Sequence, residues 1–241
     1  MKIIERPTYL EQLISARGDG NIKVISGLRR CGKSYLLKHI FKDWLIADEI
    51  PADHILLYDL ENRRNKHLLN PDVLLDTIEG RIIDDDIYYI LIDEVQKVED
   101  FTEVLASLLL IDNVEIYVTG SNSKFLSKDI VSEFRGRDTE IHMYPLSFAE
   151  FLTAYDGPES ESFLQYIYYG GLPQILTQTT HAKKAAFLNR IYRTVYLRDI
   201  YERHKIEHPD EFEELVKVLA SAIGSPTNPL NLANTFKSKK Q

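Results

Sequence analysis

The stretch SGLRRCGKS, residues 26 to 34, contains residues that could bind a phosphate group. Two glycines five apart, followed by Lys33 and Ser34, have the spacing of a phosphate-binding loop, in which successive backbone N–H groups point at phosphate oxygens. Lys33 would reach the outer phosphates, and the Ser34 hydroxyl would bind Mg²⁺. The predicted nucleotide contacts are Gly27, Leu28, Arg29, Arg30, Cys31, Gly32, Lys33, Ser34 and Tyr35.

A pair of carboxylates, Asp93 and Glu94, follows a run of apolar residues in IYYILIDEVQ. A buried strand that ends in acids brings them to the edge at which parallel sheets bind ligands. Asp93 would hold Mg²⁺ through water, and Glu94 would polarise a water against the γ-phosphate as a general base, with Lys33 stabilising charge. The alternative is an acidic strand end that begins an ordinary turn.

Polar residues after the next apolar run are further candidates. Either Ser121 or Asn122 would hydrogen-bond the γ-phosphate or the attacking water, and we place Asn122 with the catalytic groups and Ser121 with the nucleotide contacts. An ordinary turn remains the alternative. In FRGR, Arg135 or Arg137 would neutralise transition-state charge in the same chain or in a second copy, with Arg137 preferred. Two solvated arginines in a surface turn are the alternative.

These residues need a sheet to position them, and the hydrophobic pattern predicts one. Strands are expected over 21–26, 54–60, 87–93, 114–120 and 139–144. Helices are expected over 7–17, 33–47, 71–80 and 101–111. Short apolar strands separated by helices predict an α/β fold whose parallel sheet is covered on both faces. From Ser147 onward the pattern is helical, and Gly157 with Pro158 marks a boundary.

Composition narrows the class of protein. The chain has 241 residues and a formal net charge of −8, which disfavours a generic polyanion binder. It lacks a long apolar run, so we expect a cytoplasmic protein without a membrane span. The single cysteine, Cys31, excludes an internal disulfide and a cysteine metal cluster, and if it is exposed an alkylating reagent should block nucleotide binding. Asn65–Lys66 is followed by His67 and Leu68, so the guanine-binding motif is missing and GTP is disfavoured.

An ordered set of segments carries a family resemblance: GLRRCGKS, LIDEVQ, VTGSNSKFLS, FRGR, YPLSFAEF, YYGGLP and YLRDIYER. This set resembles the predicted AAA-type ATPases of bacteria and archaea in which a C-terminal domain of unknown function follows the ATPase module. The resemblance covers about residues 1–223. It implies a P-loop core of the ASCE division, with three αβα layers, sheet order 5-1-4-3-2, ATP and Mg²⁺.

The resemblance also assigns residues. The family's Walker A positions fall on Gly27, Gly32, Lys33 and Ser34, its Walker B positions on Asp93 and Glu94, its sensor on Ser121 or Asn122, and its arginine motif on Arg135 and Arg137. Residues 170–173 are similar to a lid turn near the adenine, although Gly-Gly-Pro is also an ordinary helix stop.

Three domains are expected: an ATPase core over 1–157, a helical lid over 158–206 and an incomplete winged-helix-like segment over 207–241. The resemblance predicts a recognition helix, a wing and a larger domain after Gln241. Basic residues and tyrosines alternate over 181–205, which favours nucleic-acid contact or, alternatively, the solvated face of an amphipathic helix.

The sequence therefore predicts a Mg²⁺-dependent ATPase that acts on a protein or nucleic-acid partner, such as DNA bound through the C-terminal region, and that could assemble with copies of itself. A nucleotide-dependent switch with negligible hydrolysis is the second hypothesis. A nucleic-acid-binding protein with a vestigial nucleotide site is the third.

Overall fold

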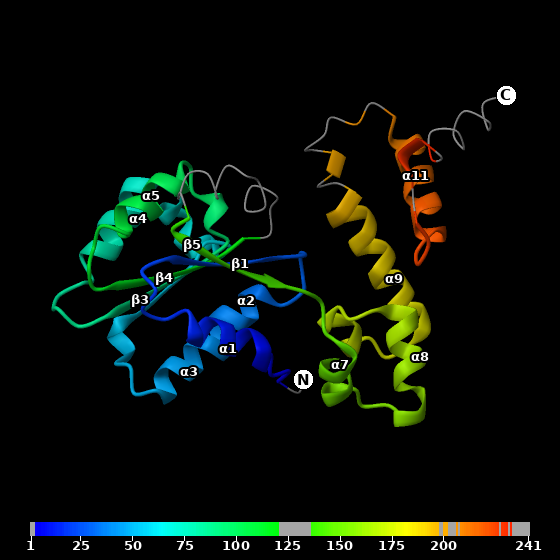
Figure 1. The fold of residues 1–241 in the computed structure, drawn as a ribbon, viewed down its shortest axis with the longest axis horizontal. Coiled ribbons are helices and arrows are strands. Elements are labelled where there is room, and N and C mark those ends of the chain that lie inside the picture. Colours follow the sequence, from blue (N-terminus) through cyan, green and yellow to red (C-terminus); the bar gives the residue numbers. More distant parts are fainter. Residues whose placement is uncertain are drawn as a thin grey trace. The chain divides into compact units, whose positions relative to one another are not determined.

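Figure 1 shows the fold in a computed structural model of the chain. The structure describes residues 3–120, 136–197, 200–201, 206, 208–226, 228–230 and 232. The chain divides into two compact units, Met1–Lys184 and Ala185–Gln241. The first unit holds the sheet and every candidate site residue that the structure describes.

The first unit is built on a five-stranded parallel sheet in the order β2-β3-β4-β1-β5. Its strands are β1 (Ile22–Gly27), β2 (Ile55–Asp59), β3 (Tyr88–Asp93), β4 (Val114–Thr119) and β5 (Asp138–Met143). Every residue of β3 is buried, as expected of a central strand covered on both faces. The predicted order 5-1-4-3-2 is confirmed, and each predicted strand is found within two residues of its expected bounds.

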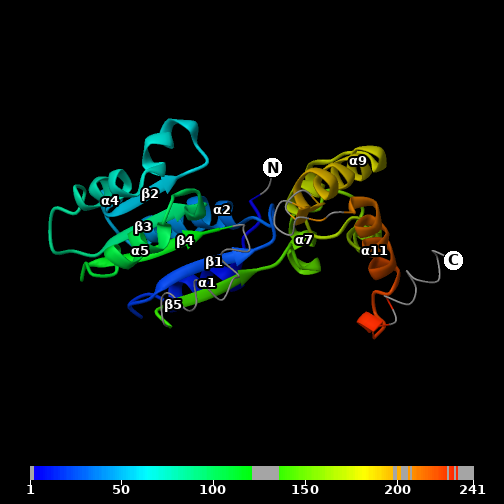
Figure 2. The same ribbon diagram turned by 90° about the horizontal axis from the view of Figure 1, so that it is seen from above.

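One face of the sheet is covered by helices from the N-terminal part of the chain, as Figures 1 and 2 show. They are α1 (Pro7–Ser15) and a continuous helix that begins as α2 (Lys33–Tyr35), passes through a π-helical segment (Leu36–Phe41) and ends as α3 (Lys42–Ala47). Leu13, Ile25, Leu37 and Phe41 are fully buried in the core of this face. This packing fixes the helix that follows the predicted phosphate loop.

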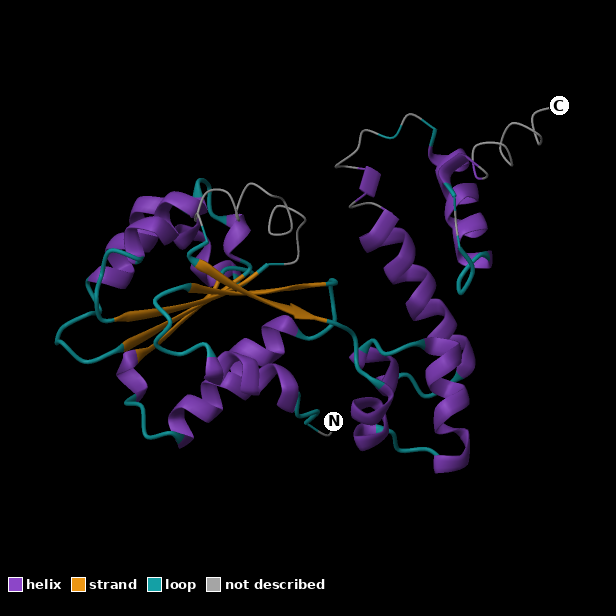
Figure 3. Cartoon of the chain, viewed as in Figure 1, coloured by secondary structure: helices purple, strands orange, loops and turns teal. Residues whose placement is uncertain are grey.

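The opposite face carries α4 (Pro71–Glu79) and α5 (Phe101–Leu108), so that the sheet lies between two helical layers (Figure 3). A 3₁₀ turn (Arg63–Leu69) precedes α4, whose first turn is capped by the Asn70 side chain accepting from the Val73 N–H. Leu74, Ile90 and Leu105 are fully buried between these layers. The three-layer αβα core predicted from the sequence is confirmed.

After β5 the chain forms α7 (Phe148–Ala154), α8 (Glu159–Tyr169) and a 3₁₀ turn (Pro173–Thr177). A Cβ atom at Gly171 would lie 2.1 Å from the Leu146 carbonyl oxygen, so this close approach requires glycine. The Leu146 N–H donates to the Gly171 carbonyl oxygen at 2.7 Å. The segment after α8 is thereby held against the end of β5.

The second unit is helical in its described residues. Helix α9 (His181–Ile191) crosses the boundary between the units and continues as a π-helical segment (Tyr192–Leu197), and α11 (Pro209–Ser221) buries none of its side chains. The part of the chain that the structure describes has no strand after β5 and no helix long and apolar enough to cross a bilayer. The domain boundaries at residues 157 and 206 stay predictions.

Candidate nucleotide-binding site

The loop between β1 and α2 owes its shape to two glycines. Gly27 has a φ of 130°, and a Cβ atom there would lie 2.1 Å from the Met143 carbonyl oxygen. Gly32 has a φ of 112° and directly precedes α2. Both are backbone conformations that favour glycine, and the first N–H groups of the helix have no partner within it. The loop thus supplies a backbone conformation that depends on glycine and a helix N-terminus, and together these favour the binding of an anion.

Lys33 is buried at this loop. Its Nζ donates to the carbonyl oxygens of Gly27 at 2.9 Å and Leu28 at 3.0 Å. Burial lowers the pKa of Lys33, and nearby negative charges, among them Glu94 and Asp93, partly oppose that shift. The structure therefore brings the lysine and the carboxylates predicted from separate motifs into one electrostatic environment.

The fully buried carboxylate of Asp93 ends β3, and Glu94 follows it in the left-handed region at a φ of 59°. The Thr119 hydroxyl donates to Asp93 Oδ1 at 2.6 Å and accepts from the Glu94 N–H at 2.9 Å. The Gln96 side-chain amide donates to Glu94 Oε2. A single threonine at the end of β4 thus orients both acidic residues.

Thr119 also lies next to the strand that leads into the phosphate loop. The register pairs it with Ile25 of β1, and the Gly120 N–H donates to the Ile25 carbonyl oxygen at 3.4 Å. Since β4 lies between β1 and β3, the loop and the acidic pair flank Thr119 at the carboxyl edge of the sheet.

Lys38 of the π-helical segment contacts the same edge. Its Nζ lies 2.9 Å from Asp93 Oδ2 and 3.0 Å from Asp59 Oδ2. Burial alone would lower the pKa of Lys38, but the hydrogen bonds with Asp93 and Asp59 outweigh it and raise that pKa. Burial likewise would raise the pKa of Asp59, and the contact with Lys38 reverses the direction. Lys38 therefore stays charged beside the carboxylate of Asp93.

The oxygen donors of Ser34 and Asp93 fit Mg²⁺, which prefers such ligands. A fully buried carboxylate that is oriented by a hydroxyl and balanced by a lysine is chemically suited to a cation.

Arg6 connects the loop to the segments after the sheet. Its Nη1 donates to the Cys31 carbonyl oxygen at 3.1 Å, its Nη2 to the Tyr144 carbonyl oxygen at 2.7 Å, and its Nε lies 2.8 Å from Glu150 Oε1. Glu150 also forms the capping box of α7 with Ser147. One buried guanidinium thus joins the phosphate loop, the end of β5 and α7.

The thiol of Cys31 is fully buried and donates to the Met143 carbonyl oxygen at 3.4 Å. Burial raises the pKa of this thiol, which disfavours the reactive thiolate. The condition for blocking the loop by alkylation, an exposed Cys31, is therefore not met.

A cavity of about 130 Å³ lies beside the loop. Its walls include Gly32 and Tyr35 from the loop and helix, Met143 at the end of β5, and Pro173 and Gln174 after the two glycines of YYGGLP. The lid turn that the family resemblance placed near a nucleotide base thus borders a cavity next to the phosphate loop.

The remaining predicted site residues are Ser121, Asn122, Arg135 and Arg137. Ser121, Asn122 and Arg135 lie outside the described residues. Arg137 is exposed, and its carbonyl oxygen accepts from the N–H of Ile22, the first residue of β1, at 3.0 Å. Because the phosphate loop follows the last residue of β1, Arg137 lies at the opposite edge of the sheet from the loop of its own chain.

Sequence reasoning missed Thr119, Lys38, Asp59 and Arg6. Thr119 had a signal, because it lies one residue before the end of the strand predicted over 114–120, whose carboxyl end had to face the site. Lys38 had a weaker one, since it follows Ser34 by about one helical turn. Arg6 had none, because its partners at Tyr144 and Glu150 are distant in sequence.

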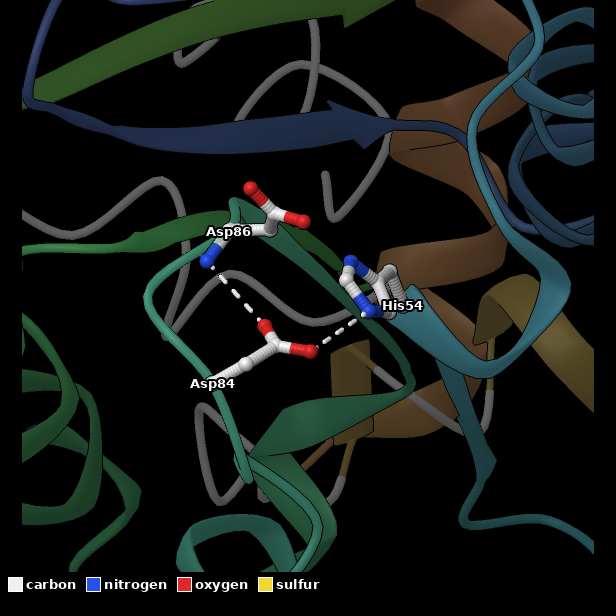
Figure 4. Close-up of side chains that lie close together, drawn as sticks. All are labelled: His54, Asp84 and Asp86. Atoms are coloured by element: carbon white, nitrogen blue, oxygen red, sulfur yellow. Dashed lines mark hydrogen bonds and ion pairs between the residues drawn. The ribbon is translucent and has the colours of Figure 1, made fainter.

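Figure 4 shows a second group of titratable residues, His54, Asp84 and Asp86, whose ligand atoms all lie within 4.8 Å of one another. His54 Nε2 is 3.4 Å from Asp84 Oδ2, and the Asp86 N–H donates to Asp84 Oδ1 at 3.0 Å. The His54 ring stacks on Tyr88 with centroids 4.3 Å apart. These contacts close the turn that leads into β3, away from the phosphate loop, and we interpret the group as structural.

The five-stranded parallel sheet and its phosphate loop define a P-loop nucleotide-binding fold. Residues 19–152 match the family model described as an AAA domain, and the chain belongs to this AAA family. Residues 160–241 match a second model, a domain of unknown function (DUF8612). The predicted combination of an AAA-type module with a domain of unknown function is confirmed.

Two curated relatives are uncharacterized proteins. One, from Haemophilus influenzae, is 32% identical over 99% of this chain and 60% of its own length. The other, from Methanocaldococcus jannaschii, is 29% identical over 90% of this chain and 50% of its own length. The chain thus spans about half to three fifths of the relatives that it matches.

Solved structures resemble the chain more distantly. Domain III of the replication initiation protein DnaA from Thermotoga maritima has a TM-score of 0.46 at 17% identity, covering 79% of this chain and 85% of that one. A DNA polymerase III gamma subunit-related protein from the same organism has a TM-score of 0.43 at 16% identity, covering 90% and 79%.

Proposed function

We propose that this chain binds ATP with Mg²⁺ at the carboxyl edge of its sheet and hydrolyses it. The observation that carries the proposal is Thr119, whose hydroxyl orients Asp93 and the backbone of Glu94 beside the strand that leads into the phosphate loop. A glycine-shaped loop, a lysine and a paired Asp-Glu at one edge form the set that phosphoryl transfer to water requires.

Each residue has a part in the proposed reaction. The loop backbone holds the phosphates, and Lys33 turns its ammonium from the loop carbonyls toward the outer phosphates. Glu94 orients a water and accepts its proton as the water oxygen attacks the γ-phosphorus and the bond to the β,γ-bridging oxygen breaks. Ser34 and Asp93 would hold Mg²⁺, which supplies charge neutralisation at the phosphates when it is bound.

Two substitutions test these roles. Lys33→Ala should abolish ATP binding, measured by calorimetry, because the cation that balances the phosphates is lost. Glu94→Gln should bind ATP normally and release no phosphate, whereas Glu99→Gln, an exposed glutamate in the next turn, serves as the matched control and should behave as the unmodified chain. Equal phosphate release by Glu94→Gln and the unmodified chain would contradict the base assignment. If the unmodified chain binds ATP but releases no phosphate, its function would be that of a nucleotide-dependent switch.

We further propose that hydrolysis rearranges the helices after the sheet and acts on a protein or nucleic-acid partner. The Arg6 contacts support this, since they connect the phosphate loop to α7. Phosphate release measured with and without duplex DNA tests the nucleic-acid class, and an unchanged rate would favour a protein partner.

Arg137 is proposed to complete the site of a second copy. Its exposure and its place at the opposite edge from its own loop support a role between chains rather than within one. The rate per chain should then rise with protein concentration, and mixing Arg137→Ala with Lys33→Ala should restore turnover. A rate independent of concentration would contradict this assembly.

A further inference from the structure

The cavity beside the phosphate loop carries an inference about which base the protein accepts. Its apolar walls include Met143 and Pro173, and Tyr35, whose ring centroid lies 4.8 Å from that of His39, also lines it. Because Gly32 belongs both to the wall and to the loop, a nucleotide whose phosphates lie on the loop has this cavity within reach of its base.

Polar groups on the cavity wall differ in whether they are paired. Arg6 donates to two backbone carbonyl oxygens and pairs with Glu150, and the Cys31 thiol donates to Met143. In contrast, Gln174 Oε1 is buried and has no hydrogen-bond partner among the residues that the structure describes. Buried polar atoms in native proteins are nearly always paired, so an unpaired one on a ligand cavity indicates a ligand that supplies the partner.

The chemistry of a glutamine amide selects among bases. Its oxygen is an acceptor, and its nitrogen, attached to the same carbon, carries two donor hydrogens. The Hoogsteen edge of adenine offers the complementary pair, a donor at the 6-amino group and an acceptor at N7, and glutamine pairs with it through two hydrogen bonds. A 6-oxo purine presents two acceptors there, so either orientation of the amide leaves one acceptor facing another.

We propose that the Gln174 side chain recognises adenine, with Oε1 accepting from the 6-amino group and Nε2 donating to N7. The inference rests on the proposed nucleotide site and adds a specificity-determining residue to it. It makes Gln174 the reason that this protein prefers ATP to inosine triphosphate, which carries an oxygen in place of the 6-amino group.

The test is calorimetric titration of the full chain with Mg²⁺ and ATP, inosine triphosphate or inorganic triphosphate. The unmodified chain should prefer ATP to inosine triphosphate. Gln174→Leu should weaken the affinity for ATP about tenfold to a hundredfold, because two hydrogen bonds to the base are lost. The affinity for inorganic triphosphate should stay unchanged, because no contact with the phosphates is lost. Gln12→Leu, an exposed glutamine on α1 outside the cavity, is the matched control and should change nothing.

A second variant covers the case in which Gln174→Leu folds poorly, which a thermal melt reveals. Gln174→Glu keeps the acceptor for the 6-amino group and should keep the preference for ATP, with weaker binding because the donor to N7 is gone. Equal affinity of the unmodified chain for the two nucleotides, an unchanged preference in folded Gln174→Leu, or a lost preference in Gln174→Glu would overturn the inference. If the unmodified chain binds neither ATP nor inorganic triphosphate, the proposed function itself fails; if it binds both without base preference, only the role of Gln174 fails.

Discussion

A lysine lies between two carboxylates at each edge of the sheet, and the two groups differ in their surroundings. At the carboxyl edge, Lys38 contacts Asp59 and Asp93, and its side chain is 20% exposed. At the amino edge, where the strands begin, Lys23 contacts Asp19 at 3.0 Å and pairs with Glu115. Its side chain is 1% exposed. Each group has one ammonium and two carboxylates, so we attribute the difference in role to position in the fold.

The Lys23 side chain is surrounded by other groups of the protein and has almost no contact with solvent. It lies 5.2 Å from the centroid of the buried Tyr117 ring, and Glu115 also accepts from the Gly18 N–H at 2.8 Å. Lys38 instead shares Asp93 with the Thr119 hydroxyl and faces the phosphate-loop edge. Charges buried on every side must satisfy one another, whereas partly exposed charges can exchange partners with a ligand.

The largest expected effect follows from breaking the buried group. Lys23→Met removes the cation from a buried Glu115 and should lower the free energy of unfolding by about 3–5 kcal/mol, because an uncompensated buried carboxylate remains. Urea unfolding measures the loss. The double variant Lys23→Met/Glu115→Leu should recover most of it, since both charges are then gone. A loss no larger in the single variant than in the double would show that the buried charge is not the cause.

The carboxyl edge has a hydroxyl that orients its acids, and Thr119→Val removes it. The Glu94 N–H and one oxygen of Asp93 would lose a buried partner, which should cost about 1–3 kcal/mol of stability. We expect the ATPase kcat to fall while KM changes little, because the phosphate loop keeps its own contacts. Thr119→Ser keeps the hydroxyl and should restore turnover, and a failure of serine to do so would assign the effect to packing of the methyl group.

Lys38→Met tests whether this lysine competes with a cation for Asp93. Lys38 is partly exposed, but its removal leaves the fully buried Asp93 carboxylate with only the Thr119 hydroxyl as a partner among the described residues, which should cost about 1–3 kcal/mol of stability. With no ammonium on Asp93, the Mg²⁺ concentration for half-maximal ATP binding should fall about threefold to tenfold. Titrations of Mg²⁺ at fixed ATP measure this. A rise in the Mg²⁺ requirement would mean that Lys38 supports the metal site rather than opposing it.

The strands and the phosphate loop could be predicted from the sequence, whereas the contacts between residues far apart in the chain could not. Four of the five strands follow from short apolar runs, and the loop follows from glycines and a lysine at fixed spacing, both of which are local patterns. Contacts between distant residues leave no such pattern: Thr119 meets Asp93 across 26 residues, and Arg6 meets Tyr144 across 138. The unpaired oxygen of Gln174 is likewise a property of packing that composition does not reveal.

The smallest expected effect is a pH dependence at the amino edge. Burial alone would raise the pKa of Asp19, but the Asn21 N–H, Lys23 and the Thr139 hydroxyl donate to its carboxylate and hold its pKa below the usual range. A carboxyl group with a lowered native pKa stabilises the fold above its unfolded pKa of about 4, and the contribution is lost as the pH falls through the native value. Asp19 is partly exposed, so solvent screening limits the contribution to at most about 1 kcal/mol.

Asp19→Asn should therefore be less stable than the unmodified chain at neutral pH, and the difference should shrink as the pH falls from 5 toward 2. Urea unfolding at several pH values measures it. Lys23 and Glu115 face Asp19 at this edge, so the variant Lys23→Met/Glu115→Leu should reduce the same pH dependence by removing the ammonium that holds the Asp19 carboxylate. A difference between Asp19→Asn and the unmodified chain that persists unchanged at pH 2 would mean that Asp19 acts through its hydrogen bonds rather than its charge. The amino-edge group would then be a hydrogen-bonded cluster, and the likeness to Lys38 would be one of geometry only.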